Sequence, residues 1–351
     1  MISVVLKKGS LHRVKTSRDA KPFDLVRAPD QRTAVAEGAA SHTAQQGASV
    51  RFLAGGTTLV DLMKLGVERP GRVVDINRLG LDDIHKQANG DLFIGATARN
   101  SDLAHHPLVR GSYSALSQAI LAGASTQLRN AATTAGNLLQ RTRCMYFRDL
   151  ASACNKRAPG SGCPAIAGTN RMLAILGTSK ACIATNPSDM AVAMMVYDAV
   201  VHIQGVAGDR QVPLMDFYVL PGERPDIENV LEPGDLVTHV TLSSPSTGER
   251  STYLKLRDRA SYEFALVSAA VAITLANGAI ASARFALGGI GTRPWRVTEA
   301  ERALVGQAPS DKAFRNAAEI CLRGARPQGQ NGFKIELARR CIVHAFKHIT
   351  Q

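Results

Sequence analysis

The sequence is most informative at residues 52–59, which read Phe52-Leu53-Ala54-Gly55-Gly56-Thr57-Thr58-Leu59. An apolar strand over 49–54 ends at the glycine pair, and apolar spacing predicts a helix over 57–65 with Thr57 or Thr58 as its cap. Glycines at such a turn let the backbone approach another group closely. The strand, turn and helix therefore form one unit that suits a binding loop.

A second loop of small residues has the same character and reads Ala132-Thr133-Thr134-Ala135-Gly136-Asn137. Each loop offers successive backbone N–H groups and hydroxyls, which suit a pyrophosphate, although ordinary turns share this composition. Two other glycine runs, at 160–165 and 288–294, are not dinucleotide fingerprints. Neither has the strand-turn-helix context, and Pro164 and Pro294 interrupt them.

Outside these loops, strand and helix patterns alternate, which predicts an α/β or α+β protein. We expect strands over 72–76, 91–97, 200–203, 236–242, 252–256 and 279–287, and helices over 34–48, 100–108 (capped by Asn100 or Ser101), 112–122, 190–199, 298–304, 312–323 and 332–349. Periodicity leaves 265–275 open as strand or helix. The predicted domains are a basic tail over 1–22, a first domain over 23–243 and a second over 244–351.

Four of the six cysteines lie close together in the sequence, at Cys144, Cys154, Cys163 and Cys182, in a loop-like segment with little periodicity. Neighbouring arginines and lysines predict lowered thiol pKa values and readiness to bind metal. Four thiolates suit structural zinc or a cubane iron–sulfur cluster, and the lack of a C-x2-C pair counts against zinc. Unliganded buried thiols are the alternative. For Cys321 and Cys341, on predicted helices, we expect only a structural role.

Composition excludes several classes of protein. The 351 residues hold 42 Lys and Arg against 29 Asp and Glu, for a net charge of +13, which alone would suit nucleic acid or another polyanion. No recognisable helix-turn-helix or aromatic stacking platform supports a nucleic-acid partner. No apolar run is long enough to span a bilayer, and the basic start lacks the apolar stretch of a signal peptide. No nucleophile–base arrangement stands out, so no catalytic residue is predicted.

Taken together, several motifs resemble the FAD-binding subunits of the molybdenum hydroxylases, the family of xanthine dehydrogenase and carbon monoxide dehydrogenase. The motifs are the two loops above, Gly123-Ala124-Ser125-Thr126-Gln127-Leu128-Arg129-Asn130, Pro187-Ser188-Asp189, Tyr253 to Tyr262 and Ala286-Leu287-Gly288-Gly289. The resemblance implies an α+β protein. Its first domain has the FAD-binding fold of the vanillyl-alcohol oxidase and CO dehydrogenase flavoprotein type, and its smaller C-terminal domain is α+β and CO dehydrogenase flavoprotein-like.

The cysteine segment, over 141–184, resembles the iron–sulfur insertion in the flavoprotein subunit of periplasmic aldehyde oxidoreductase. This implies that Cys144, Cys154, Cys163 and Cys182 hold a [4Fe-4S] cluster. The flavin subunit of 4-hydroxybenzoyl-CoA reductase has an insertion with different cysteine spacing. One departure from the family is Asn186, which stands where a histidine is expected before Pro187.

The resemblance also implies the residues that hold FAD. Arg51 to Leu59 (Arg51, Phe52, Leu53, Ala54, Gly55, Gly56, Thr57, Thr58, Leu59) and Thr133 to Asn137 (Thr133, Thr134, Ala135, Gly136, Asn137) would cradle the pyrophosphate. Asp189 and Lys255 would hold other polar parts of the cofactor. Val240 would make an apolar contact.

The implied function is electron relay within an oxidoreductase heterotrimer. A large subunit with the molybdenum cofactor would oxidise an aldehyde to a carboxylate. A small subunit with two [2Fe-2S] clusters would pass electrons on, and FAD here would deliver them to a small-molecule acceptor. The periplasm is the expected compartment, by co-export with a signal-bearing partner, with the cytoplasm as the alternative.

Alternative functions are the flavin subunit of a xanthine dehydrogenase or 4-hydroxybenzoyl-CoA reductase, and a basic iron–sulfur protein that binds nucleic acid or serves as a scaffold.

Overall fold

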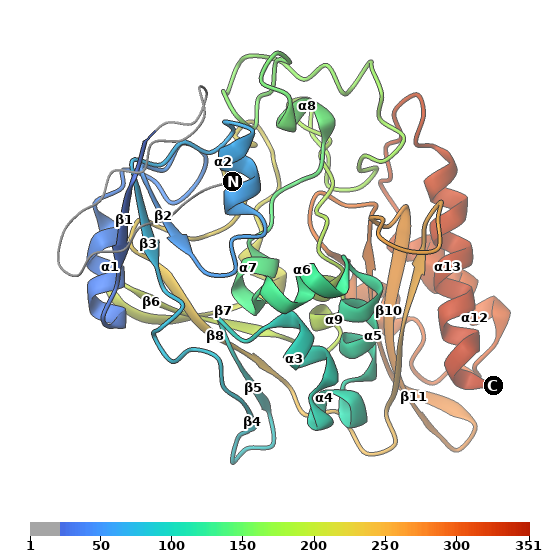
Figure 1. Cartoon of the computed structure of the whole chain (residues 1–351). Helices are drawn as coiled ribbons and strands as arrows, with labels where there is room; N and C mark the ends of the chain where they lie inside the picture. The colour runs from blue at the N-terminus through green and yellow to red at the C-terminus, as the bar shows by residue number, and fades with distance from the viewer. Residues whose placement is uncertain (1–21) are drawn as a thin grey trace.

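The computed structural model describes residues 22–351, so the predicted basic tail lies almost entirely outside the described residues. Within these residues the strands form three sheets: a parallel sheet of three strands, an antiparallel sheet of five strands and an antiparallel sheet of four strands. Figure 1 shows the first sheet and the last sheet on opposite sides of the molecule, with a group of short helices between them. The mixture of helix and sheet agrees with the predicted α+β class.

The strands are β1 (Asp24–Arg27), β2 (Val50–Leu53), β3 (Arg72–Asp75), β4 (Ile84–Lys86), β5 (Leu92–Gly95), β6 (Val200–Gly205), β7 (Gly208–Pro213), β8 (Leu236–Leu242), β9 (Arg250–Leu256), β10 (Val267–Ala276), β11 (Ala279–Gly288) and β12 (Trp295–Arg296). The parallel sheet has the order β1-β3-β2, the five-stranded sheet the order β4-β5-β8-β6-β7 and the four-stranded sheet the order β12-β11-β10-β9. The helices are α1 (Gln31–Ala39), α2 (Leu59–Lys64), α3 (Asn100–His105), α4 (Pro107–Ser112), α5 (Ser114–Ala122), α6 (Thr126–Ala131), α7 (Thr134–Leu138), α8 (Met145–Arg148), α9 (Asp189–Met195), α10 (Leu214–Phe217), α11 (Thr298–Arg302), α12 (Asp311–Cys321) and α13 (Phe333–Thr350).

Two hydrophobic cores meet at strand β10. One face of β10 places Ala270 and Ala272 in the core that also contains α5, α9 and the five-stranded sheet. The other face places Val271 and Ile273 against α12 and α13. Because both faces of β10 are buried, its sequence is apolar except for Ser268 and Thr274, which is why periodicity could not separate strand from helix.

Some local predictions are wrong. The helix predicted over 34–48 ends at Ala39, and residues 40–48 form turns stabilised by hydrogen bonds such as Ser41 Oγ to Thr43 O. Neither Thr58 nor Arg99, the residues at the N-caps of α2 and α3, makes a side-chain capping bond. In contrast, α9 has a side-chain cap, because the Ser188 hydroxyl accepts a hydrogen bond from the N–H of Ala191.

The cysteine segment crosses the top of the molecule in Figure 1, from the region of α2 to the region of α13, with α8 as its one helix. A small apolar cluster around Phe147 and Ile183 packs this segment against Leu62 and Val67. Within residues 22–351, no helix has the length and apolar character needed to cross a bilayer.

Candidate functional site

The two small-residue loops touch each other at Gly55. A Cβ atom built there would lie 1.9 Å from the carbonyl oxygen of Ala131, at the end of α6, so any larger residue would force the loops apart. The next residue, Gly56, has φ +73°, a conformation that side chains rarely adopt. Both glycines of the pair are therefore required by the local backbone.

The first loop has unused backbone donors. The N–H groups of residues 55–59 donate to no acceptor within residues 22–351, and they precede or open helix α2. Consecutive free N–H groups at a glycine turn form a concave donor surface for an anion. This arrangement fits the pyrophosphate predicted for the loop.

The second loop is mostly engaged within the protein. The N–H groups of Thr134 and Ala135 donate to Ala98 O and Ala96 O, and the N–H of Asn137 donates to Thr133 O. Gly136 N makes a long bond of 3.3 Å to Thr133 Oγ1. The loop 133–137 therefore supplies shape and position, whereas the loop 55–59 supplies the free donors.

Two cavities meet at these loops. The narrow cavity, about 210 Å³, and the wide cavity, about 710 Å³, share Thr57, Thr58 and Gly136 in their walls. A ligand with two bulky ends and a central anionic linker could occupy both cavities across this junction. An extended dinucleotide has this form.

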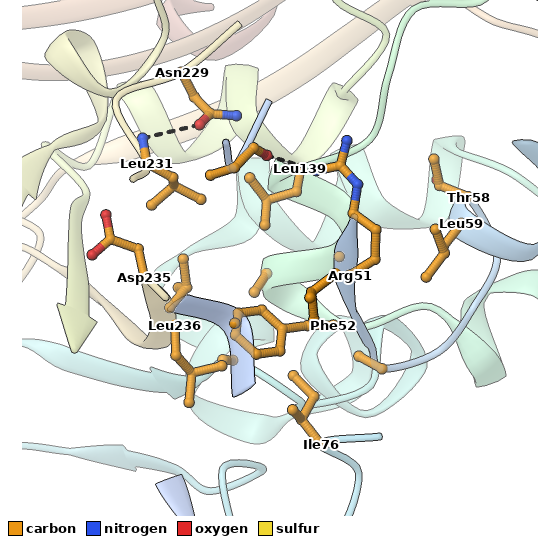
Figure 2. Close-up of a pocket in the computed structure, with 18 of the residues that line it drawn as sticks. Arg51, Phe52, Thr58, Leu59, Ile76, Leu139, Asn229, Leu231, Asp235 and Leu236 are labelled. Carbon is orange, nitrogen blue, oxygen red and sulfur yellow. Dashed lines mark hydrogen bonds between the residues drawn. The ribbon is translucent and has the colours of Figure 1, made fainter. Parts of the chain in front are cut away.

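The narrow cavity is lined by apolar side chains around Phe52, with Ile76 and Leu236 beside it and Arg51 at the edge (Figure 2). All predicted residues from Arg51 to Leu59 except Leu53 line it, as do Thr133, Ala135 and Gly136. An apolar cavity with polar groups at its rim suits a planar aromatic group.

Three predicted site residues lie elsewhere. Val240 is fully buried in β8, paired with Ile94 and Val201, and is not part of either cavity wall. The same strand brings Leu236 and Val237 to the narrow cavity instead. Leu53 and Thr134 also lie outside both walls, and the Thr134 hydroxyl donates to Ala98 O.

The wide cavity brings together Asp189 and Lys255, which are 66 residues apart in sequence. Lys255 Nζ lies 2.8 Å from Asp189 Oδ2, and the Tyr253 hydroxyl donates to Asp189 Oδ1 at 2.5 Å. Burial and the neighbouring Asp189 carboxylate raise the pKa of Tyr253 well above its ordinary value. The pair is almost fully buried, with 4% of the Lys255 side chain and 11% of the Asp189 side chain exposed.

Asn137 and Asn186 lie in the same wall of the wide cavity. Asn137 Oδ1 accepts hydrogen bonds from Gln140 and from the Ser188 hydroxyl. Asn186 Oδ1 accepts from the backbone N–H of Ser188, so the residue that departs from the family pattern holds the turn leading into α9.

A buried chain of ion pairs connects the narrow cavity to the cysteine segment. Arg51 pairs with Glu68 at 3.0 Å, Arg141 pairs with Glu68 at 2.6 Å and also with Glu228, and Lys156 pairs with Glu228 at 2.9 Å. Burial alone would raise the pKa of Glu228, but Arg141 and Lys156 outweigh it and lower this pKa to about 2. Sequence reasoning missed this network because its charged residues are scattered and form no local motif.

The four clustered cysteines line one small cavity together with Phe147 and Lys156. None of them forms a disulfide, and Cys144 and Cys182 are buried. Within residues 22–351, however, no three His, Cys, Asp or Glu side chains stand close enough together to hold a metal ion. The structure thus gathers the four thiols around a common space without arranging them as metal ligands.

The prediction that neighbouring cations lower the thiol pKa values is wrong for Cys144, Cys163 and Cys182. Burial raises the pKa of Cys144 and of Cys163, and it raises the pKa of Cys182 to about 11 although Lys156 acts in the opposite direction. Desolvation disfavours a thiolate more than one nearby ammonium favours it. Metal binding here would have to displace the protons. Cys321 and Cys341 are buried in α12 and α13, as their structural role predicts.

Comparison of the sequence with known protein families shows which family the chain belongs to. Residues 31–245 match the FAD binding domain in molybdopterin dehydrogenase, and residues 252–349 match the CO dehydrogenase flavoprotein C-terminal domain. The chain belongs to the molybdopterin dehydrogenase flavoproteins. Residues 246–251 lie between the two matches.

Individual relatives agree with this family. The chain is 52% identical over 307 residues to the aldehyde oxidoreductase FAD-binding subunit PaoB of Escherichia coli strain K12, covering 87% of this chain and 92% of the relative. It is 25% identical to the glyceraldehyde dehydrogenase medium chain of Sulfolobus acidocaldarius, covering 86% and 91%. Among solved structures, reconstituted CO dehydrogenase from Oligotropha carboxidovorans has the same fold, with a TM-score of 0.73, 23% identity, and coverage of 94% of this chain and 98% of that chain.

Proposed function

We propose that the chain is the FAD-containing electron-transfer subunit of a molybdenum-dependent aldehyde oxidoreductase, a complex that oxidises an aldehyde to a carboxylate. The observation that carries the proposal is the pair of cavities that meet at a glycine loop with free N–H groups. The choice of aldehyde as substrate is supported by the 52% identity to an aldehyde oxidoreductase subunit.

The residues that line the two cavities fit FAD in one orientation across them. The free N–H groups of residues 55–59 would hold the pyrophosphate, the apolar wall around Phe52 would hold the adenine, and the wide cavity would hold the flavin. The buried Asp189–Lys255 pair would fix polar groups at the flavin end. Bound FAD would supply a centre that takes up two electrons and passes them on.

We propose further that Cys144, Cys154, Cys163 and Cys182 hold a [4Fe-4S] cluster, since four thiols without disulfides line one cavity. Iron and acid-labile sulfide should fall strongly in Cys163→Ser. Cys341→Ser, at a buried cysteine on α13, is the matched control and should keep both. Iron unchanged in Cys163→Ser would contradict the cluster.

The cluster could relay electrons or only hold the fold together. Cys154→Ser separates the two roles. Flavin reduction at the normal rate combined with loss of assembly would assign the cluster a scaffold role, whereas slowed flavin reduction in an assembled complex would place the cluster on the electron path.

The proposed partners are a large molybdenum-cofactor subunit and a small subunit with two [2Fe-2S] clusters. Their identity rests on family membership and on the relatives, which are subunits or chains of larger enzymes.

The periplasm, reached by co-export with a signal-bearing partner, is the proposed compartment. Recovery of the tagged complex in the cytoplasmic rather than the periplasmic fraction would refute that placement.

Co-purification with absorption spectroscopy tests the function. The chain expressed with both partner genes should be yellow, release one FAD per chain on denaturation, and lose its flavin absorption when an aromatic aldehyde is added without oxygen. A colourless protein that retains nucleic acid, or a flavin reduced by xanthine but not by any aldehyde, would contradict the proposal.

A further inference from the structure

One wall of the wide cavity carries two arginine side chains but only one carboxylate that pairs with them. Arg143 and Arg148 both face a single carboxylate oxygen, Asp61 Oδ2, at distances of 3.6 Å from Arg143 Nη1 and 2.5 Å from Arg148 Nη2. Two guanidinium groups against one carboxylate leave a unit of positive charge at this wall. The Asp189–Lys255 pair on the same cavity is neutral and does not compensate for it.

Several donors on this cavity have no acceptor. Arg143 Nε and Arg148 Nη1 are buried and make no hydrogen bond to any residue in 22–351, and the same holds for Arg129 Nε in the cavity wall. Only 27% of the Arg143 side chain and 23% of the Arg148 side chain are exposed. Buried donors without acceptors are costly, so an anionic ligand with free oxygens would stabilise this arrangement.

An aromatic surface adjoins the arginines. The Arg143 guanidinium lies 5.1 Å from the centre of the Phe264 ring, which is 40% exposed and lines the same cavity. A cation and an exposed ring side by side suit a planar ligand that carries an anionic group. The free N–H groups of residues 55–59 already provide for the FAD pyrophosphate, so these arginines are available for a different ligand.

We propose that Arg143 and Arg148, with Arg129, form an anion-binding subsite in the wide cavity that selects planar aromatic electron acceptors bearing a sulfonate, carboxylate or phosphate group. The inference rests on the proposed function, because it needs a reduced flavin in the same cavity. In the step that the subsite would serve, a quinone takes two electrons and two protons from one reduced flavin. The quinone becomes a hydroquinone and the flavin returns to its oxidised form.

A matched pair of acceptors tests the subsite in the intact complex. 1,2-Naphthoquinone-4-sulfonate and 1,2-naphthoquinone undergo the same two-electron reduction and differ by one sulfonate. The measured quantity is the ratio of kcat/KM for the sulfonated quinone to kcat/KM for the neutral one. Arg143→Gln and Arg148→Gln should each lower this ratio about fivefold, and Asp61→Asn should raise it about twofold, with smaller effects at high salt.

Two controls make the test specific. Arg148→Lys keeps the charge and should restore most of the ratio, while Arg315→Gln, on the exposed surface of α12, should leave it unchanged. An unchanged ratio in Arg143→Gln and Arg148→Gln would overturn the subsite, as would an equal loss for both quinones. Loss of FAD from these variants would assign the arginines to the flavin phosphates and would also overturn it. Absence of FAD from the wild-type complex would instead refute the proposed function.

Discussion

Gly55 lies where the first loop touches the end of α6, and no other residue type fits there. In Gly55→Ala, the new Cβ would meet Ala131 O at 1.9 Å, so the loops must separate at a cost of about 1–3 kcal/mol. FAD content should drop at least tenfold because the donor surface is distorted. The measurement is FAD released per chain, together with the thermal unfolding midpoint.

Gly111→Ala is the control for this substitution. Gly111 lies in α4, and an added Cβ atom there would have no neighbouring atom within 4 Å. The free energy of unfolding should therefore change by less than about 0.5 kcal/mol, and FAD should be retained. Full FAD occupancy in Gly55→Ala would show that the first loop is not the phosphate site.

Lys255 neutralises a buried carboxylate. Lys255→Met would leave Asp189 buried without its cation, which should lower the free energy of unfolding by about 3–5 kcal/mol. Tyr253→Phe removes only a hydrogen bond to the same carboxylate and should cost about 1–2 kcal/mol. Urea denaturation of the three proteins measures both; equal stability of Lys255→Met and wild type would rule out the pairing.

Among individual residues, the sequence predicted those that belong to local motifs. The glycine loops, the four cysteines and Ser188-Asp189 were all recognisable because each motif is continuous or has a characteristic composition. Tyr253, Glu68 and Glu228 were not assigned roles, since their partners are far away in the sequence and only the tertiary fold brings them together.

Among the elements, the cysteine segment is attached to its surroundings by ion pairs that depend on pH. Because the folded pKa of Glu228 is lowered to about 2 from an ordinary value of 4.5, its stabilisation is fully present above pH 4.5 and is lost between about pH 4.5 and 2. The free energy of unfolding should therefore fall steeply over this range. In Glu228→Gln the decrease in the free energy of unfolding over this pH range should be smaller by roughly 2–3 kcal/mol. A pH profile identical to that of the wild type would contradict the network.

A second attachment comes from α13. Lys334 is fully buried, and its Nζ donates to Leu173 O in the cysteine segment and to Gly289 O after β11. In Lys334→Met both carbonyls lose their donor, so amide hydrogen exchange at residues 174–176 should accelerate at least tenfold. Lys312→Met, at an exposed position on α12, should leave exchange unchanged. Equal protection in both variants would show that Lys334 does not anchor the segment.

The prediction of elements succeeded where one face is clearly apolar or capped, as in α9, β8 and α13. It failed for β7, whose sequence Gly208 to Pro213 is polar because the strand lies at the edge of its sheet. The strand β10 stayed ambiguous because both of its faces are buried. These failures arise from tertiary position, which local sequence does not encode.

For the whole molecule, the sequence predicted the class of fold but not how the sheets meet. The walls of the wide cavity come from α2, the cysteine segment and the strand β9, which are separated by about half the chain. No local pattern could show that these segments form one cavity. The net charge of +13 now has a partial physical account, because five cations of residues 127–157 line the cavities proposed for anionic cofactors. Arg129, Arg143 and Arg148 line the wide cavity, Arg141 lines the narrow cavity, and Lys156 lines the cavity of the four cysteines.

An experimental structure of the protein bound to FAD would test the proposed flavin site most directly. We predict adenine beside Phe52 in the narrow cavity, the pyrophosphate on the N–H groups of residues 55–59, and the flavin ring in the wide cavity near the Asp189–Lys255 pair. Flavin density outside these two cavities, or a pyrophosphate that makes no contact with the loop 55–59, would contradict this placement of FAD.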